Sequence, residues 1–404
     1  MINVAILGYG TVGSGVYEIF NRNSQVIKKN TGKDVKVKYV LDLREFPDDP
    51  VMDVLVHDFN VILDDPEVEV VAEVMGGVEP AYTFVKSALL KGKSVCTSNK
   101  ELVAKHGPEL IDIAKNQGRN FFFEASVGGG IPIIRPLMQS ITADKINSIT
   151  GILNGTTNYI LTKMCKEGLG FDEVLKEAQD LGYAERNPSA DVDGFDACRK
   201  IAILTSLAYG KNVDFEDIYT EGITKISDVD FKYANKMGCS VKLFGSANKV
   251  NDDIFAMVAP VMIDNTNPLF NVEGVFNGIL VNGNVLGDVM FYGSGAGKLP
   301  TASAVVSDMV EAIKNLNNNV EINWTSEKLE LADIKNSEKK FFVRIQGNAA
   351  ERKEEIEKAF GRVSVIELNE VDGEFAFVTE KMAECKFEEA ASKTEGIINR
   401  IRMQ

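Results

Sequence analysis

One lysine follows four carboxylates in the segment Glu185–Lys200, whose sequence is ERNPSADVDGFDACRK. The carboxylates belong to Glu185, Asp191, Asp193 and Asp196. Asp196 and Lys200 are four residues apart, so their side chains share one face if the segment is helical. Turn-forming residues come first, and apolar residues at helical spacing follow, at Ile201, Leu204, Leu207 and Ala208. The pattern predicts an ammonium group among carboxylates at the start of a helix.

Such an arrangement can support proton transfer. A lysine donates or accepts a proton when its pKa lies near the working pH, and neighbouring carboxylates can bind a cationic substrate group. The same residue types are also typical of an ordinary helix start, where acidic side chains suit the helix dipole and one ion pair lies on the surface. The rest of the chain must decide between these two interpretations.

Length and composition narrow the class of protein. The 404 residues exceed the roughly 250 to 300 at which a single core stops growing, so we expect two or three domains. Apolar residues at 45% and charged residues at 25% are ordinary for a soluble globular protein. The net charge of −15 argues against nucleic acid or an anionic membrane as a partner, because both require clustered Lys and Arg.

Cysteine and histidine usage limits the chemistry further. Five scattered cysteines without metal spacing indicate reduced thiols and predict a cytoplasmic protein. The N-terminus lacks the basic and small-residue features of a signal peptide, and no run is apolar and long enough to span a membrane. Only two histidines occur, His57 and His106, which argues against a zinc site or a Ser-His-Asp triad.

A glycine-rich turn follows the first predicted strand, residues 2–7. Gly8, Gly10 and Gly13 form G-x-G-x-x-G ahead of helix-forming residues. These glycines allow a tight turn, the approach of a pyrophosphate, and close packing of helix on strand. The pattern predicts a dinucleotide site, with a ligand-free tight turn as the alternative.

Strand and helix patterns then alternate, which predicts a doubly wound parallel sheet. A polar insertion at residues 21–34 precedes a second strand that ends near Asp42 and Arg44. The acid favours a ribose 2′-hydroxyl and the arginine favours a 2′-phosphate, so the choice between NAD and NADP stays open. Ser98 and Lys100 fall beyond a later strand, at the sheet edge where ligands of such folds bind.

Further glycine-rich turns occur at residues 128–130 and 293–297. The first follows Glu124, and carboxylate and carbonyl oxygens there could hold a hard cation, although such a run is more often just a sharp turn. A helix from about Thr301 should return to the nucleotide-binding domain. The last 65 or so residues show a βαββαβ order, which indicates a ferredoxin-like module. We expect three domains, at 1–145 with about 293–320, at 146–292, and at 338–404.

With these motifs in place, the chain resembles homoserine dehydrogenases over nearly its whole length. The matching motifs are GYGTVGSGV, TSNKELVA, FEASVGGGIPII, GILNGTTNYI, GYAERNPSADVDGFDACRK and GSGAGKLPTASAV. The resemblance implies reversible NAD(P)-dependent interconversion of L-homoserine and L-aspartate 4-semialdehyde, in threonine and methionine biosynthesis. It also implies a Rossmann-like nucleotide domain, an α+β domain for catalysis and dimerisation, and a homodimer or higher homo-oligomer.

The resemblance assigns residues by motif. Lys200 and Lys100 correspond to the catalytic lysines, with Lys200 transferring the proton and Lys100 polarising the carbonyl. The substrate-binding residues are Glu185, which would hold the substrate ammonium, with Asp191, Asp196, Gly155 and Thr156. The nucleotide-binding residues are Gly8, Gly10, Thr11, Val12, Gly13, Asp42, Arg44, Ser98 and Gly297. The family's sodium site matches Glu124 with the carbonyls of Val127, Gly129 and Ile131.

The chain also departs from the family pattern. Many members have an acidic residue where this chain has Asn187, and an arginine where it has Leu41. The C-terminal module resembles an ACT domain, which implies amino-acid feedback by threonine, yet its first loop, Gly347–Glu351, lacks the usual Pro-Gly turn. Rival interpretations are another dehydrogenase of small amino or hydroxy acids, and a catalytically silent regulatory protein that senses nucleotides and amino acids.

Overall fold

The computed structural model describes all residues from 1 to 404, and the chain forms two compact units. The first unit consists of Met1–Lys145, Ala202–Phe215 and Phe291–Leu329. The second consists of Ile146–Ile201, Glu216–Met290 and Glu330–Gln404. Each unit is therefore assembled from segments that are far apart in the sequence.

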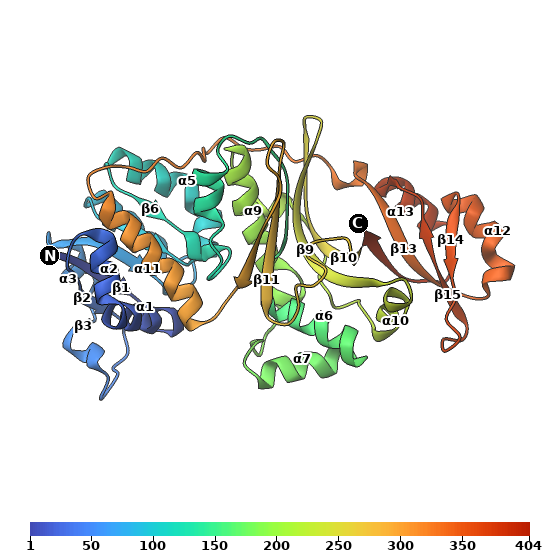
Figure 1. Cartoon of the computed structure of the whole chain (residues 1–404), viewed down its shortest axis with the longest axis horizontal. Helices are drawn as coiled ribbons and strands as arrows, with labels where there is room; N and C mark the ends of the chain where they lie inside the picture. Colours follow the sequence, from blue (N-terminus) through green and yellow to red (C-terminus); the bar gives the residue numbers. More distant parts are fainter. The chain divides into compact units, whose positions relative to one another are not determined.

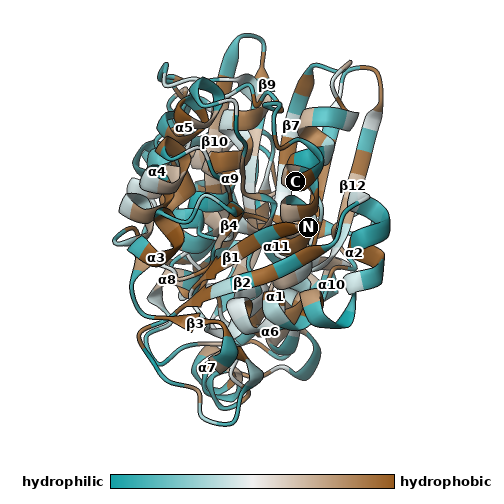
Figure 2. Ribbon diagram, turned by 90° about the vertical axis from the view of Figure 1, so that its left-hand side faces the viewer, coloured by the Kyte–Doolittle hydropathy of each residue, from teal (hydrophilic) through white to brown (hydrophobic).

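The first unit contains a six-stranded sheet in which every neighbouring pair is parallel. Its order is β3 (Leu55–Val56), β2 (Val35–Leu41), β1 (Ile2–Leu7), β4 (Val68–Glu73), β5 (Ser94–Thr97) and β6 (Phe121–Phe122). The central strands β1 and β4 are buried almost throughout, as continuous apolar sequences predict for a sheet covered on both faces. The ribbon of β1 is accordingly mostly brown in Figure 2.

Helices between these strands, together with one from a later segment, pack in the first unit. They are α1 (Thr11–Arg22), α2 (Ser24–Thr31), α3 (Phe59–Leu63), α4 (Ala81–Leu90), α5 (Lys100–Asn116) and α11 (Lys298–Lys314). Helix α11 lies beside α1 although nearly 300 residues separate them, and Figure 1 shows the two in orange and dark blue. The packing is close because Gly15 has no side chain: a Cβ there would lie 2.9 Å from the Cβ of Ala302.

The polar insertion expected at residues 21–34 is mostly helical. Helix α1 continues to Arg22, and α2 occupies Ser24–Thr31 with Ile27 as its buried residue. Its sequence is polar because the rest of the helix surface faces solvent.

The second unit contains a mixed sheet. Its order is β12 (Gly287–Ser294), β11 (Phe276–Gly283), β7 (Ile146–Ile152), β9 (Cys239–Val250), β10 (Asp253–Asp264), β17 (Ile397–Met403), β13 (Glu338–Gln346), β15 (Glu374–Thr379) and β14 (Val363–Ile366). Its long central hairpin, β9 and β10, is buried over nearly its whole length. The short strands β8 (Tyr219–Thr220) and β16 (Met382–Ala383) pair with β10 and β13. No helix in the chain is both long and apolar enough to cross a membrane.

The second unit also contains helices, two of which, α8 (Ser189–Val192) and α9 (Phe195–Tyr209), carry residues of the acidic segment, residues 185–200. The helices are α6 (Gly155–Glu167), α7 (Phe171–Asp180), α8, α10 (Asp228–Lys236), α12 (Ala349–Phe360), α13 (Glu384–Ser392) and the first half of α9. The acidic segment therefore crosses a short helix and enters α9, as the turn and spacing signals predicted.

The C-terminal residues follow the expected element order, β13-α12-β14-β15-α13-β17, with the short β16 before α13. They belong to the second unit and continue its sheet. The link is the last strand, β17, which pairs in parallel with β10 at Val261↔Arg402 and Met262↔Met403. A single sheet thus runs from the hairpin of β9 and β10 into the C-terminal residues 338–404.

Candidate functional site

The nucleotide-binding motif forms a turn that requires its glycines. Gly8 has a φ of +98°, in the left-handed region that favours glycine. A Cβ at Gly13 would lie 1.9 Å from the carbonyl oxygen of Gly8, so no larger residue fits there. Helix α1 begins directly afterwards with Gly10 as its N-cap and no side-chain cap. A helix start without a side-chain cap is compatible with the predicted dinucleotide site, where an anion would accept from the first amides.

A cavity of about 440 Å³ adjoins this turn. Its lining includes Gly8 and Gly10, the end of β2 with Asp42 and Arg44, and the apolar Phe84. Apolar walls with a few polar groups are typical of cofactor sites. The structure therefore brings together the glycine turn and the two residues that the sequence proposed for the ribose end of the nucleotide.

The Asp42 carboxylate accepts four hydrogen bonds. The donors are the amide of Tyr9 at 2.8 Å, the main-chain amide of Arg44 at 3.0 Å, and the Nε and Nη2 groups of Arg44 at 2.9 Å each. The hydrogen bonds from Arg44 lower the pKa of Asp42, although partial burial opposes this. The side chain of Arg44 remains 62% exposed. An acceptor suited to a ribose 2′-hydroxyl and a donor suited to a ribose 2′-phosphate thus lie at the same strand end.

Lys100 is the first residue of α5 and lies half-buried at the helix start. Asn99 caps this helix by accepting the amide of Leu102 at 3.1 Å, and its own amide donates to Thr97 Oγ1 at 2.9 Å. Thr97 Oγ1 in turn donates to the buried Glu73 at 2.6 Å. Burial raises the pKa of Glu73, while these hydrogen bonds oppose the shift. The position of Lys100 therefore depends on buried polar groups beneath it.

The carboxylate of Glu124 organises the residues that follow the glycine run. It accepts the backbone amides of Ile133 and Ile134 at 2.6 and 2.7 Å on Oε1, and that of Arg135 at 2.7 Å on Oε2. A carboxylate has about four acceptor positions, so most of its capacity is used by the backbone. Sequence reasoning did not anticipate this role, because nothing in the spacing shows which amides a buried glutamate will meet.

The two later glycine-rich turns meet each other. The amide of Gly130 donates to the carbonyl of Ser294 at 3.0 Å. A Cβ at Gly129 would lie 2.2 Å from the carbonyl oxygen of Gly295, so the backbones touch directly. Gly297, with a φ of +114°, is the N-cap of α11. The sequence showed both turns but not that they pack together.

Lys200 lies in a buried ion pair in the second unit. Its Nζ donates to Asp196 Oδ2 at 2.8 Å and to the carbonyl of Leu153 at 2.7 Å. The two side chains are only 11% and 5% exposed. The shared helical face predicted from the spacing is therefore confirmed, but the surface ion pair of the alternative interpretation is wrong, because the pair is buried.

Asn154 completes this cluster and was missed by sequence reasoning. Its Oδ1 caps α6 by accepting the amide of Thr157 at 2.8 Å. Its Nδ2 donates to Asp191 Oδ1 at 2.7 Å and to Asp196 Oδ2 at 2.9 Å. One amide side chain thus joins two carboxylates that the sequence separates. The available signal was an asparagine directly before Gly-Thr-Thr at a predicted helix start.

The remaining predicted substrate residues lie around this cluster in different ways. Glu185 is exposed, and the contact it makes with Gln179 is through its main-chain carbonyl, at 3.0 Å. The hydroxyl of Thr156 donates to the carbonyl of Tyr183 at 2.6 Å, which holds the turn before the acidic segment. Gly155 starts α6, and a Cβ there would lie 2.8 Å from the Val275 carbonyl oxygen.

Two neighbouring regions of the chain match the models of known protein families. Residues 8–124 match the family model "Homoserine dehydrogenase, NAD binding domain". Residues 132–310 match the model "Homoserine dehydrogenase". The first region contains the glycine turn, Asp42 and Lys100, and the second contains the Lys200 cluster.

Similar proteins include two curated bacterial homoserine dehydrogenases. The one from Synechocystis is 47% identical over 319 residues, which is 77% of this chain and 73% of the relative. The one from Bacillus subtilis is 45% identical over 318 residues, which is 78% of this chain and 73% of the relative.

Solved structures agree in fold. A homoserine dehydrogenase from Thiobacillus denitrificans has a TM-score of 0.91 at 33% identity, and the match covers 100% of this chain and 98% of that one. A hyperthermophilic archaeal homoserine dehydrogenase in complex with NADPH has a TM-score of 0.65 at 30% identity, with 77% of this chain and 97% of that one covered.

Proposed function

Because this chain belongs to the homoserine dehydrogenase family and is an NAD(P)-dependent oxidoreductase, we propose that its two units divide the work of one reaction. The reaction interconverts L-homoserine and L-aspartate 4-semialdehyde. The first unit binds the nucleotide at the glycine turn, and the second binds the substrate at the Lys200 cluster. The observation that carries this division is the buried contact between Lys200 and Asp196.

Lys200 is the proton-transfer residue in this proposal. Reduction of the aldehyde adds a hydride to carbon and leaves an alkoxide, which must take up a proton. Donation to the alkoxide requires the ammonium form of Lys200, and acceptance of a proton requires the neutral amine. In the oxidation direction the same side chain accepts the hydroxyl proton as hydride leaves to the nucleotide. Leu153 and Asp196 hold the amine in position for both directions.

The other predicted substrate residues have supporting roles. Lys100, at the start of α5, polarises the carbonyl as charge develops on its oxygen. Glu185 is exposed and suits binding of the substrate ammonium. Asp191 and Asp196 shape the pocket through Asn154, and Gly155 and Thr156 form its wall.

The ribose end suits both nucleotides. The Asp42 carboxylate would accept the 2′-hydroxyl of NAD in place of one hydrogen bond from Arg44, and the exposed Arg44 guanidinium would donate to the 2′-phosphate of NADP. The glycines Gly8, Gly10 and Gly13 lie against the pyrophosphate, where Thr11 and Val12 begin the helix. Ser98 and Gly297 complete the nucleotide-binding positions carried by the family motifs.

A sodium ion is proposed for the loop that follows Glu124. The carbonyls of Val127, Gly129 and Ile131 are oxygen ligands of the kind that hard cations prefer, and glycine allows close approach. Because the Glu124 carboxylate already accepts three amides, the carbonyls would supply most of the coordination. A bound ion would stabilise the loop, and the proton-transfer step requires no contact with it.

The C-terminal residues 338–404 suit an ACT-like regulatory domain. Their strands lie in the order β17-β13-β15-β14, which is that of a ferredoxin-like βαββαβ module. The other domains in this proposal are residues 1–145 with about 293–320, and residues 146–292. Threonine is the proposed effector, a homodimer or higher homo-oligomer the proposed assembly, and the cytoplasm the proposed location. A threonine titration of the reaction rate tests the regulatory role.

The decisive experiment measures NADH and NADPH oxidation with L-aspartate 4-semialdehyde, for wild type and for Lys200→Ala. We expect turnover by the wild type and a loss of kcat of about 100- to 10,000-fold in the variant, which is the usual contribution of a general acid. The affinity for the nucleotide should stay unchanged, because Lys200 lies outside the glycine turn. A variant that kept its kcat would refute the assignment of Lys200.

A further inference from the structure

The edge of strand β10 carries two strands one after the other. The short β8 pairs with it at Met257↔Tyr219 and Val258↔Thr220, and the C-terminal β17 pairs with it four residues further on. The residue that directly follows β8 is Glu221. Its side chain therefore lies where the two strands approach each other.

Glu221 is bonded to two arginines of the last strand. Its Oε2 accepts Arg402 Nη1 at 2.7 Å and Arg400 Nη1 at 3.0 Å, and it also accepts the hydroxyl of Tyr219 at 2.9 Å. Burial raises the pKa of Glu221, but the two arginines outweigh it and the net shift is downward. Arg402 is itself only 1% exposed and bonds to Glu384 at the start of α13. Glu221 is thus a carboxylate held charged by the C-terminal strand.

The main chain after Glu221 lies directly against the acidic segment. The amide of Ile223 donates to the carbonyl of Val192 at 2.8 Å. A Cβ at Gly222 would lie 2.1 Å from that same carbonyl oxygen and 2.5 Å from the Cα of Asp193. The two backbones are therefore in contact with no space between them, and a shift of one must move the other.

The contacted residues lie between the predicted substrate groups. Val192 and Asp193 follow Asp191, and the carbonyl of Gly194 accepts the amide of Cys198 at 2.9 Å to begin the helix of Asp196 and Lys200. Gly194 has a φ of +88°, and its Cβ would meet Thr220 and Val258 at 3.1 to 3.2 Å. Residues of both sides, including Asp193, Phe195, Glu221 and Arg400, line one cavity of about 520 Å³.

We propose that Glu221 is a positioning residue for the substrate site, which connects the C-terminal strand to the segment that carries Asp191, Asp196 and Lys200. It touches none of the reacting groups itself. Its two arginine contacts hold the backbone at Gly222 and Ile223, and this backbone holds Val192 and Asp193. The C-terminal module thereby affects substrate binding through a defined contact. This inference rests on the substrate role proposed above for the Lys200 cluster.

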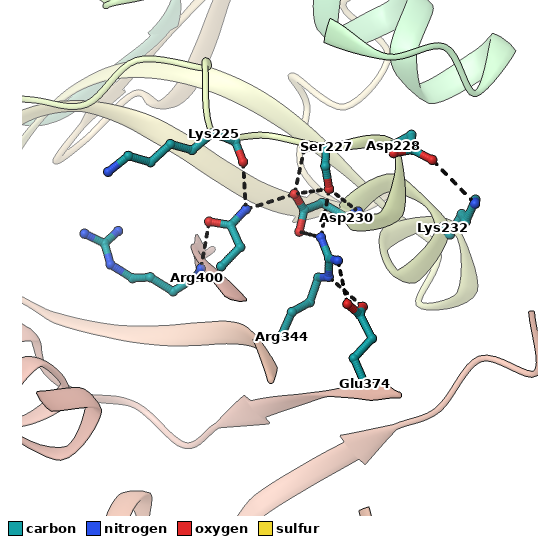
Figure 3. A network of polar contacts seen from close by, with 9 residues as sticks. Lys225, Ser227, Asp228, Asp230, Lys232, Arg344, Glu374 and Arg400 are labelled. Atoms are coloured by element: carbon teal, nitrogen blue, oxygen red, sulfur yellow. Dashed lines mark hydrogen bonds and ion pairs between the residues drawn. The ribbon is translucent and has the colours of Figure 1, made fainter. Parts of the chain in front are cut away.

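A second buried network in the same module provides the matched control. Figure 3 shows Arg344 between Asp230 and Glu374, with Ser227 as a further partner. Arg344 donates to Glu374 at 2.8 and 2.9 Å and to Asp230 at 3.0 Å. This network also joins the C-terminal strands to the rest of the second unit, through α10, but Glu374 lies on β15, whereas Glu221 directly precedes the backbone at Gly222 and Ile223 that contacts Val192 and Asp193. Its loss should cost stability alone.

The test compares Glu221→Gln with Glu374→Gln in the full-length enzyme. Each change removes one carboxylate charge with little change of volume, and each carboxylate accepts charged hydrogen bonds from arginine. We expect Glu221→Gln to raise the KM for homoserine about 10- to 100-fold, the range expected from losing charged hydrogen bonds, with the KM for the nucleotide within twofold of wild type. Glu374→Gln should lower the Tm but leave both KM values unchanged.

Assays are run well below the lowest Tm, so that the folded fraction is the same for all variants. If Glu221→Gln does not fold, Arg400→Met removes the more exposed partner of the same contact and should raise the KM for homoserine in the same direction. An unchanged KM for homoserine, an equal rise in both variants, or a fall in kcat alone overturns the proposal. Lys200→Ala is measured in parallel. Its kcat tests the role proposed for the Lys200 cluster, whereas the difference in KM between the two glutamine variants tests Glu221, so the failure of one proposal can be told from the failure of the other.

Discussion

The proposed nucleotide site and the proposed substrate site are built from different parts of the chain. Around Gly8 and Gly13 the proposed site consists of backbone: missing side chains allow a tight turn, and α1 begins without a side-chain cap. Around Lys200 the site consists of side chains from separate segments, joined by Asn154 and buried from solvent. The first kind of site depends on positions that have no room for a side chain. The second depends on which charged and amide side chains come into contact after folding.

The largest effect in this comparison is expected at the glycine turn. Gly13→Ala places a Cβ 1.9 Å from the carbonyl oxygen of Gly8, which the backbone can relieve only by moving. We expect a loss of about 3 kcal/mol in the free energy of unfolding, at the upper end of usual overpacking costs. The nucleotide affinity should fall with it.

The control is Gly10→Ala, because a Cβ at Gly10 meets nothing within 4 Å. Chemical denaturation and nucleotide titration measure both variants. Equal stability for the two substitutions would show that the turn tolerates a side chain, and would contradict the backbone-based description of the nucleotide site.

A second buried lysine, Lys242, can be compared with Lys200 to show what the Asp196 carboxylate contributes. Lys242 is 2% exposed, and its Nζ donates to the carbonyl of Val272 at 2.7 Å. Burial lowers the pKa of Lys242 to about 8. Because this value is below the unfolded one of about 10.4, the charged form is penalised on folding. Above about pH 10.4 the side chain is neutral in both states, so folding carries no penalty from it. The stability of the folded state falls as the pH drops from about 10.4 through 8, where the penalty for the buried charge reaches about 3 kcal/mol.

Lys242→Met removes that cost and one hydrogen bond worth about 1 kcal/mol. We therefore expect the free energy of unfolding to rise by about 2 kcal/mol at pH 7, with the gain disappearing near pH 10. Denaturation curves at several pH values measure it. Lys200→Met should have the opposite sign at pH 7, because it removes the bonded partner of a buried carboxylate. A destabilised Lys242→Met protein at pH 7 would contradict the penalty.

A smaller effect is expected at the amide that joins the carboxylates. Asn154→Ala removes the contacts with Asp191 and Asp196 together with the cap of α6. We expect kcat/KM for homoserine to fall about 10- to 50-fold, in line with the loss of one or two hydrogen bonds to charged groups.

The cap alone costs about 1 kcal/mol of stability, so Asn348→Ala serves as its control. Asn348 caps α12 through the amide of Ala350 at 2.9 Å and belongs to the C-terminal module. If both variants lost stability and kept full activity, Asn154 would be a helix cap and nothing more.

Local patterns accounted for much of the fold. Strand β1, the glycine turn and α1 follow one another as predicted, since a buried apolar strand and a glycine-only turn depend on residues that are close in sequence. The helix start at Asp196 and the element order of the C-terminal module were likewise readable from spacing and turn residues. The helix α2 was not, because a polar surface helix with one buried residue has little apolar periodicity to mark it.

Contacts between distant segments escaped prediction for a common reason. The three amides on Glu124, the meeting of Gly129 with Gly295, and the position of Glu221 against the last strand each join residues whose separation in the sequence carries no periodic signal. Their partners are decided by which elements become neighbours in a sheet. That choice depends on the burial of whole surfaces, and local propensity does not encode it.

The sequence by itself determined where the chain must turn, which faces are apolar, and that Asp196 and Lys200 share one side of a helix, since chain geometry acts over four residues or fewer in each case. Only the tertiary structure decided that this pair is buried, that Asn154 joins it to Asp191, and that the C-terminal strand supports it through Glu221. The physical reason is burial. An ion pair at the surface contributes little to stability, and it becomes a defined, oriented group only where packing excludes water.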